Sequence, residues 1–114
     1  MLLFSDMLRG HTETIILARL MKSDSYGYEI NKSIQSLTEG KFELKEATLY
    51  TAFRRLESGG YIISYWGGEE TGARRRYYSI TDKGRQLYQD NIDEWLSSRE
   101  LIDKLIILQN DSED

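Results

Sequence analysis

The 114-residue sequence contains neither cysteine nor proline. Without cysteine, the chain can form no disulfide and no thiolate metal site, and it has no cysteine nucleophile. Without proline, nothing interrupts a long helix at a fixed point. No apolar run approaches the roughly 20 residues that cross a bilayer, and the apolar start at residues 1–4 is too short for a signal peptide. We therefore expect one cytoplasmic domain that does not contact a membrane.

Signatures of catalysis are also missing. The single histidine, His11, has no cysteine or clustered acid at metal-ligand spacing, so a surface or capping role is expected for it. No Ser–His–Asp set, phosphate-binding loop or glycine-rich nucleotide fingerprint is present. The acidic pairs at 69–70 and 93–94 fall on a predicted turn and on a helix exterior, where they are solvated. We expect no enzyme, no metal and no cofactor.

Charge is unevenly distributed along the chain. The net charge of −4 argues against a nucleic-acid partner, but residues 1–85 carry 13 basic and 11 acidic side chains. Residues 86–114 carry 2 basic and 8 acidic side chains. A surface that faces a nucleic-acid duplex is therefore possible, provided that the acidic C-terminal end points away from it.

Hydrophobic periodicity predicts helices first and then a hairpin. Apolar residues recur at helical spacing over 9–22, 27–37 and 46–58. The β-branched and aromatic segments 61–66 and 75–80, separated by a glycine-rich charged turn, predict two antiparallel strands. Thr81 is a suitable N-cap for a last helix from Asp82 to about Gln109, roughly 28 residues long.

This order of elements is typical of one fold class. The prediction is a mainly α protein with a small β-hairpin, in which three helices and a hairpin wing form a winged helix-turn-helix domain over residues 1–80. A long C-terminal dimerisation helix would cover residues 81–110, and a polar tail residues 111–114.

The third predicted helix has one apolar face and one face suited to a DNA duplex. Leu49, Phe53 and Leu56 would lie in the core. Hydroxyl, methyl and guanidinium groups, which can bond phosphates or base edges, would face outward. These residues are Ala47, Thr48, Tyr50, Thr51, Arg54 and Arg55. The alternative is an ordinary solvated helix face.

The predicted second strand begins with a basic run, Arg74-Arg75-Arg76. Strand alternation places Arg74 and Arg76 on one face and Arg75 on the other. A basic hairpin can lie along phosphates or enter the minor groove. The alternative is a charged edge strand that prevents aggregation, and the acids at 69–70 weaken the positive field.

The last predicted helix carries an apolar stripe near heptad spacing, interrupted by Arg99. Its members are Tyr88, Ile92, Trp95, Ile102 and Ile106. A second copy of the chain is the simplest partner for this stripe, with Met7, Leu8 and Ile15 joining the interface. The alternative is a monomer in which the helix folds back. Trp95 either packs at the dimer seam or forms, with its copy, a flat slot for a planar small molecule.

Six short motifs in a fixed order resemble the PadR family of transcription regulators, in its short-tailed subfamily with a single C-terminal helix. They lie at 8–13, 26–30, 46–50, 54–57, 72–78 and 81–84, and the resemblance covers about residues 7–96. It implies a homodimer on a pseudo-palindromic operator of double-stranded DNA, with the third helix in the major groove and the wing along the backbone. In many members a small aromatic compound relieves repression.

The resemblance also implies an effector site. In multidrug-responsive lactococcal members, a tryptophan at the position of Trp95 pairs across the dimer and sandwiches planar drugs. Carried onto this chain, the lining would be Met7, Gly10, Thr14, Ile92, Trp95 and Arg99. Arg99 replaces an acid and Thr14 an apolar residue, so an anionic or neutral aromatic effector is expected.

Together these observations predict a DNA-binding repressor. The DNA contacts would come from Thr48, Tyr50, Thr51, Arg54 and Arg55 on the helix and from Arg74, Arg75 and Arg76 on the wing. Two other functions stay open. One is a protein-interaction adaptor that kept the fold without DNA binding, which the net charge of −4 favours. The other is a drug-sequestering dimer without a regulatory role.

Overall fold

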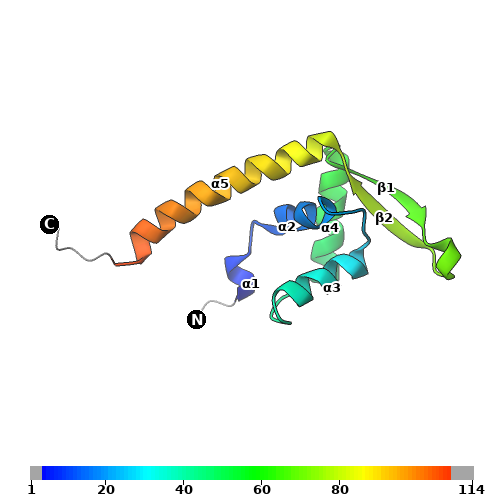
Figure 1. Cartoon of the computed structure of the whole chain (residues 1–114), viewed down its shortest axis with the longest axis horizontal. Helices are drawn as coiled ribbons and strands as arrows, with labels where there is room; N and C mark the ends of the chain where they lie inside the picture. The colour runs from blue at the N-terminus through cyan, green and yellow to red at the C-terminus, as the bar shows by residue number, and fades with distance from the viewer. Residues whose placement is uncertain (1–3, 109–114) are drawn as a thin grey trace.

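Helices, a two-stranded hairpin and one long helix follow one another in the computed structural model, which describes residues 4–108 (Figure 1). The elements are α1 (Phe4–Met7), α2 (Thr12–Leu20), α3 (Gly27–Leu37), α4 (Glu46–Ser58), β1 (Ile62–Gly67), the 3-10 turn η1 (Glu69–Thr71), β2 (Arg75–Ile80) and α5 (Asp82–Ile106). The predicted mainly α fold with a hairpin and a long C-terminal helix is therefore confirmed. No helix among residues 4–108 is long and apolar enough to cross a membrane.

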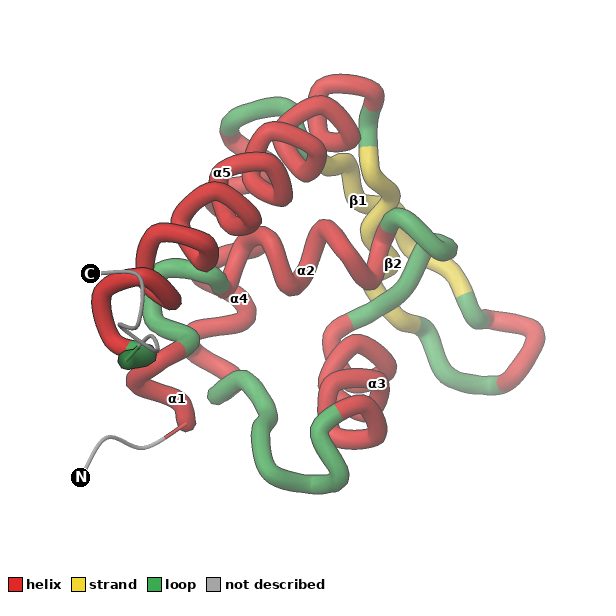
Figure 2. The backbone as a smooth tube through the Cα atoms, turned by 60° about the vertical axis from the view of Figure 1, so that its left-hand side comes forward, coloured by secondary structure: helices red, strands yellow, loops and turns green. Residues whose placement is uncertain are grey.

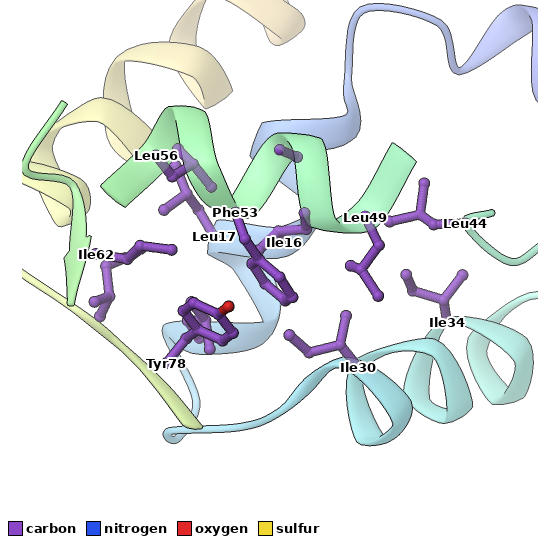
Figure 3. Packing of buried hydrophobic residues seen from close by; sticks show 13 residues of the cluster. Ile16, Leu17, Ile30, Ile34, Leu44, Leu49, Phe53, Leu56, Ile62 and Tyr78 are labelled. Carbon is purple, nitrogen blue, oxygen red and sulfur yellow. The ribbon is translucent and has the colours of Figure 1, made fainter. Parts of the chain in front are cut away.

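The core lies where α2, α3 and α4 meet the hairpin (Figure 3). Ile16 and Leu17 of α2, Ile30 of α3 and Leu56 of α4 are almost fully buried. The rings of Phe53 and Tyr78 stack with centroids 3.9 Å apart and planes 16° apart, which joins α4 to β2. The hairpin is thus part of the same core as the three helices.

The hairpin has a regular antiparallel register from Ile62↔Ile80 to Gly67↔Arg75. Ser25, which precedes α3, forms an isolated bridge to Tyr78 on the free side of β2. Its amide donates to the Tyr78 carbonyl at 3.2 Å and its carbonyl accepts from the Tyr78 amide at 2.8 Å. This short third segment ties the base of the wing to the start of α3.

Two predicted helices differ from the structure at their ends. The helix expected over 9–22 begins only at Thr12, because Gly10 adopts φ +91° and separates α1 from α2. The last helix ends at Ile106, so the prediction of about Gln109 was too long for the described chain. Gln109 itself and the expected polar tail at 111–114 lie outside the described residues. The predictions for 27–37 and 46–58 are confirmed, and the first strand is shifted by one residue.

The first turns of α5 are docked firmly on the domain. Thr81 caps the helix as predicted, since its Oγ1 accepts from the Gly84 amide at 3.1 Å. Farther along, Leu87 and Tyr88 pack on the core, and Asn91 donates to Thr14 Oγ1 of α2 at 2.8 Å. Beyond this point α5 projects past the bundle (Figures 1 and 2). The N-terminal half of α5 is therefore packed on the core of its own chain, whereas the C-terminal half faces α1 and the start of α2 across a cavity and is largely exposed.

Gly84 allows this close docking, and the substitution Gly84→Ala tests its role. A Cβ at residue 84 would collide with the carbonyl oxygen of Tyr61 and lie 2.8 Å from Ile80 Cγ1. Alanine in a helix normally stabilises by about 1 kcal/mol relative to glycine. Here we expect destabilisation by about 1–3 kcal/mol through overpacking, measured by urea unfolding at fixed protein concentration.

The matched control is Ser97→Ala, at an exposed position of the same helix. It should change the free energy of unfolding by less than about 0.5 kcal/mol. A stabilised Gly84→Ala variant would show that α5 can move away from the hairpin without cost.

Candidate nucleic-acid interface

The buried residues of α4 determine which of its faces points outward. Leu49, Ala52, Phe53 and Leu56 are all buried against the core. The opposite face carries the side chains predicted to contact DNA. Ala47, Thr48, Tyr50, Arg54 and Arg55 are exposed, and Thr51 is half-buried. The structure therefore brings the five predicted helix residues onto one surface.

Two contacts fix α4 against α3. The Asn31 side chain donates to the Leu44 carbonyl and accepts from the Leu44 amide, both at 2.8 Å, which pins the loop before α4. Gly27 lies directly against α4, since a Cβ there would lie 3.0 Å from Tyr50 Oη. A bulkier residue at 27 would push the two helices apart, so this glycine keeps Tyr50 in place.

Both arginines of α4 make weak local contacts. Arg54 donates to Thr51 Oγ1 at 3.3 Å, and Arg55 pairs with Glu13 of α2 at 3.8 Å. Pairs between exposed groups contribute about 0–1 kcal/mol, because water and salt screen them. A phosphate can therefore replace these partners at little cost.

The three wing arginines lie on opposite faces of the hairpin, as strand alternation predicted. The guanidinium carbons of Arg74 and Arg76 lie 4.7 and 5.7 Å from the centroid of the Trp66 ring. Arg75 lies 4.7 Å from the Tyr26 ring on the other face. The wing thus divides its charge between two surfaces, of which only one faces α4.

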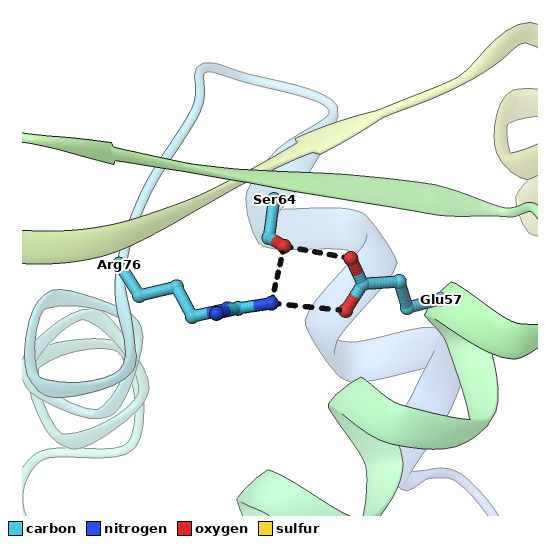
Figure 4. A network of polar contacts seen from close by, with 3 residues as sticks. All are labelled: Glu57, Ser64 and Arg76. Carbon is cyan, nitrogen blue, oxygen red and sulfur yellow. Dashed lines mark hydrogen bonds and ion pairs between the residues drawn. The ribbon is translucent and has the colours of Figure 1, made fainter.

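Arg76 connects the wing to α4 through a polar network (Figure 4). Ser64 donates to Glu57 Oε2 at 2.6 Å, and Arg76 donates to Ser64 Oγ at 2.8 Å. Arg76 also pairs with Glu57 at 3.8 Å. Sequence reasoning missed Glu57 and Ser64, because only the strand register and the roll of α4 bring them together. The network makes the hairpin and α4 one continuous surface.

The other face of the wing is held by aromatic contacts. Tyr65 and Tyr77 stack with centroids 5.6 Å apart, and Tyr26 meets Tyr77 edge-on at 5.2 Å. The Tyr65 hydroxyl donates to Asp24 at 2.5 Å, and this hydrogen bond raises the pKa of Tyr65 to about 12. Burial likewise raises the pKa of Tyr78. Arg75 belongs to this supporting face, on the side away from Trp66.

The acidic end of the chain lies far from this surface. The described part of the acidic segment, residues 86–108, runs along α5 toward its C-terminal end, and the hairpin tip lies at the opposite end of the molecule (Figure 1). The principal extents of 65 × 30 × 21 Å reflect this elongated arrangement. The condition that the acidic end should point away from the predicted duplex is met within the described residues.

A second candidate site lies between α1, the start of α2 and α5. It is a cavity of about 590 Å³. Five of the six predicted effector residues line it, namely Met7, Gly10, Thr14, Ile92 and Trp95. Arg99 is not among the residues that line it within one protomer, and it borders a separate shallow pocket with Leu96, Glu100 and Asp103.

The chemistry of this cavity differs from the expectation. The His11 ring meets Trp95 edge-on at 5.2 Å, and Glu94 also contributes to the lining. Among the described lining residues within one protomer, the acid Glu94 is present and Arg99 is not, so the expectation of an anionic effector gains no support from this lining and stays untested. The resemblance placed Arg99 in a slot shared by two protomers, and only a structure with both protomers would test that placement.

Comparisons with known proteins agree with this geometry. The family model described as "Transcriptional regulator PadR-like family" matches residues 16–90. A transcriptional regulator from Clostridium thermocellum superposes with a TM-score of 0.81 and 46% identity, covering 89% of this chain and 98% of the other.

A PadR family transcription regulator from Clostridium difficile R20291 superposes with a TM-score of 0.73 and 35% identity, covering 85% and 99% of the two chains. An uncharacterised protein of Lysinibacillus sphaericus is 42% identical over 99 residues, which is 87% of this chain and 91% of that protein. The similarity to these proteins thus covers both the winged domain and α5.

Proposed function

This chain belongs to the PadR-like family of transcriptional regulators, and on that premise we propose that it is a homodimeric repressor released by a small aromatic effector. DNA-binding regulation of transcription, rather than enzymatic activity, follows from family membership. What we propose beyond this is that the protein represses transcription, that it acts as a dimer on a symmetric operator, and that a small aromatic effector releases it. The observation that carries the proposal is the continuous outward surface of α4 and the wing.

In the proposed complex, α4 lies in the major groove, whose width of about 12 Å admits one helix. The hydroxyl and guanidinium groups of Thr48, Tyr50, Thr51, Arg54 and Arg55 face the groove and its phosphates. Arg74 and Arg76 reach the backbone from the α4 side of the wing, and Arg75 does so from the other face. The weak intramolecular partners of Arg55 and Arg76 are exchanged for phosphates.

The proposed dimer uses the part of α5 that its own chain leaves uncovered. Ile102 is 44% exposed and Ile106 is 71% exposed, on the same side of α5 as Trp95. A second copy would bury this stripe around a two-fold axis. The same axis would place two recognition helices about 34 Å apart, which matches one turn of the duplex.

The proposed effector site is the cavity beside Trp95. Near the two-fold axis, the cavities and tryptophans of both protomers would face one another and accept a planar ring. Of the described lining residues, Glu94 alone carries a full charge, which favours a neutral or cationic aromatic compound. A ligand that changes the angle between protomers would weaken DNA binding, and DNA would weaken its binding by the same factor.

The DNA-binding proposal is tested with a duplex selected from a random pool. We expect recovery of an inverted repeat with half-sites about one helical turn apart. Arg54→Ala should weaken binding by roughly tenfold. It should also make the slope of log affinity against log salt concentration shallower, by the amount expected for the loss of about one phosphate contact per half-site. The control is Lys104→Ala, which removes the same charge from an exposed position far along α5.

An unchanged affinity and salt slope for Arg54→Ala would rule out α4 as the groove-reading helix. Recovery of no enriched sequence, even at low salt, would instead favour a winged-helix adaptor without DNA binding.

The dimer proposal is tested with Ile106→Asp. Burying an unpaired carboxylate at the seam costs about 3–5 kcal/mol, so we expect the dimer dissociation constant to rise by a hundredfold or more. Sedimentation velocity over a concentration series measures this. Ser97→Asp adds the same charge on another exposed face of α5 and should leave the dimer intact. A dimer that tolerates both substitutions equally would have another interface.

The effector proposal is tested with ethidium, a planar cation, and pyrene sulfonate, a planar anion, in the absence of DNA. We expect ethidium to bind more tightly and Trp95→Ala to weaken it by roughly tenfold, the scale of a lost aromatic stack. Glu94→Gln should weaken ethidium but not the sulfonate, whereas Arg99→Ala should change neither by more than about twofold, because Arg99 lies off the cavity. Tighter binding of the sulfonate would contradict the charge argument.

A further inference from the structure

Trp66 is a large aromatic residue that is exposed to solvent near the end of the wing. It is 51% exposed and is the residue of β1 that precedes Gly67, the last residue of the strand. Among the described residues, the ring contacts recorded for Trp66 are those with the guanidinium groups of Arg74 and Arg76. An exposed cation–π pair is worth only about 0.5–1 kcal/mol, so this cluster contributes little to folding by itself.

The strand register places this cluster on the α4 side of the wing. Trp66 pairs with Arg76 and lies on the same face as Ser64, two residues earlier. Ser64 donates to Glu57 at the C-terminal end of α4. The Trp66 ring and its two arginines therefore extend the surface of α4 outward along the hairpin.

The neighbouring side chains on α4 belong to the candidate DNA surface. Glu57 lies three residues after Arg54 and seven after Tyr50, spacings that place all three on one side of a helix. Moving from α4 to the wing, a duplex would thus meet Tyr50 and Arg54 first and then the cluster around Trp66. The surface is continuous and carries aromatic and positive groups, with the Glu57 carboxylate between them paired to Arg76.

The hairpin tip itself is a poor place for phosphates. The turn η1 carries Glu69 and Glu70, both exposed. Their charges repel the DNA backbone, so the contact should be centred lower on the wing, at the level of Trp66. The positive flanks of that ring select an anionic partner, and continuity with α4 indicates that the partner is the same duplex.

We propose that Trp66 is a DNA contact of the wing. Its ring packs against the deoxyribose edge of the minor groove beside α4, and Arg74 and Arg76 pair with the phosphates on either side. The inference rests on the proposed DNA-binding function and adds an uncharged residue to an interface otherwise described by charge. Sugars and phosphates carry no base identity, so this contact adds affinity without sequence preference.

Binding measurements on the selected duplex and on an unrelated duplex test this. Trp66→Ala should weaken both by roughly tenfold, the scale of a lost aromatic stack, and Trp66→Phe by less. The slope of affinity against salt should stay unchanged, because tryptophan releases no counterion. The matched control is Ile63→Ala, which removes a 55% exposed side chain from the opposite face of β1 and should change affinity by less than about twofold.

Fluorine NMR of protein labelled with fluorotryptophan gives a second readout. The chain has two tryptophans, and Trp66→Phe assigns their resonances. We expect the Trp66 resonance to shift when the duplex is added, even if Trp66→Ala folds poorly. Two results together would overturn the inference: the wild-type protein binds the duplex without a shift of its Trp66 resonance, and Trp66→Phe binds the duplex with unchanged affinity. Wild-type protein that binds no duplex at all would instead overturn the proposed function on which it rests.

Discussion

The stack between Phe53 and Tyr78 is the contact on which the candidate interface depends. Phe53 lies in α4 and Tyr78 in the middle of β2, so their stacking at 3.9 Å sets α4 against the wing. The backbone of Tyr78 also exchanges two hydrogen bonds with Ser25, just before α3. One buried pair thus joins the hairpin to both helices of the helix-turn-helix. Because interiors are close-packed, a change in this pair would shift all three elements together.

The first turn of α2 lies between the two candidate sites. On one side, Glu13 pairs with Arg55 of α4 at 3.8 Å. On the other, Thr14 accepts from Asn91 of α5 at 2.8 Å, and His11 contacts Trp95. A ligand that displaced this turn would therefore change the energy of contacts on α4 as well as at its own cavity. This is a physical connection for linkage, since a ligand shifts an equilibrium only through contacts that differ between states.

Local patterns predicted the elements well, and tertiary geometry explains the errors. Apolar spacing over 27–37 and 46–58 identified α3, α4 and the outward face of α4. This works because the apolar residues of an amphipathic helix recur at helical spacing on the face that is buried. The break before α2 was missed, since a glycine signals a left-handed turn only when the following packing demands it, as at Gly10. Glu57 and Ser64 could not be paired from sequence, because their contact depends on the strand register and the roll of α4. The role of Arg99 stays a prediction, because the slot for which it was proposed forms only between two protomers.

Two acidic residues, Glu13 and Glu57, pair with arginines of the candidate DNA surface and should lower its affinity for DNA. Glu13 and Glu57 hold Arg55 and Arg76 in place, so these arginines are partly ordered before any duplex arrives. Each pair is exposed and weak, so exchanging a carboxylate for a phosphate gains little free energy beyond the release of counterions from the duplex. We expect binding built from such exchanges to be of moderate affinity and to weaken as the salt concentration rises. A ligand can shift the equilibrium between two states only by the ratio of its affinities for them. The proposed effector would therefore release the protein from DNA more easily when the affinity for DNA is moderate than when it is high.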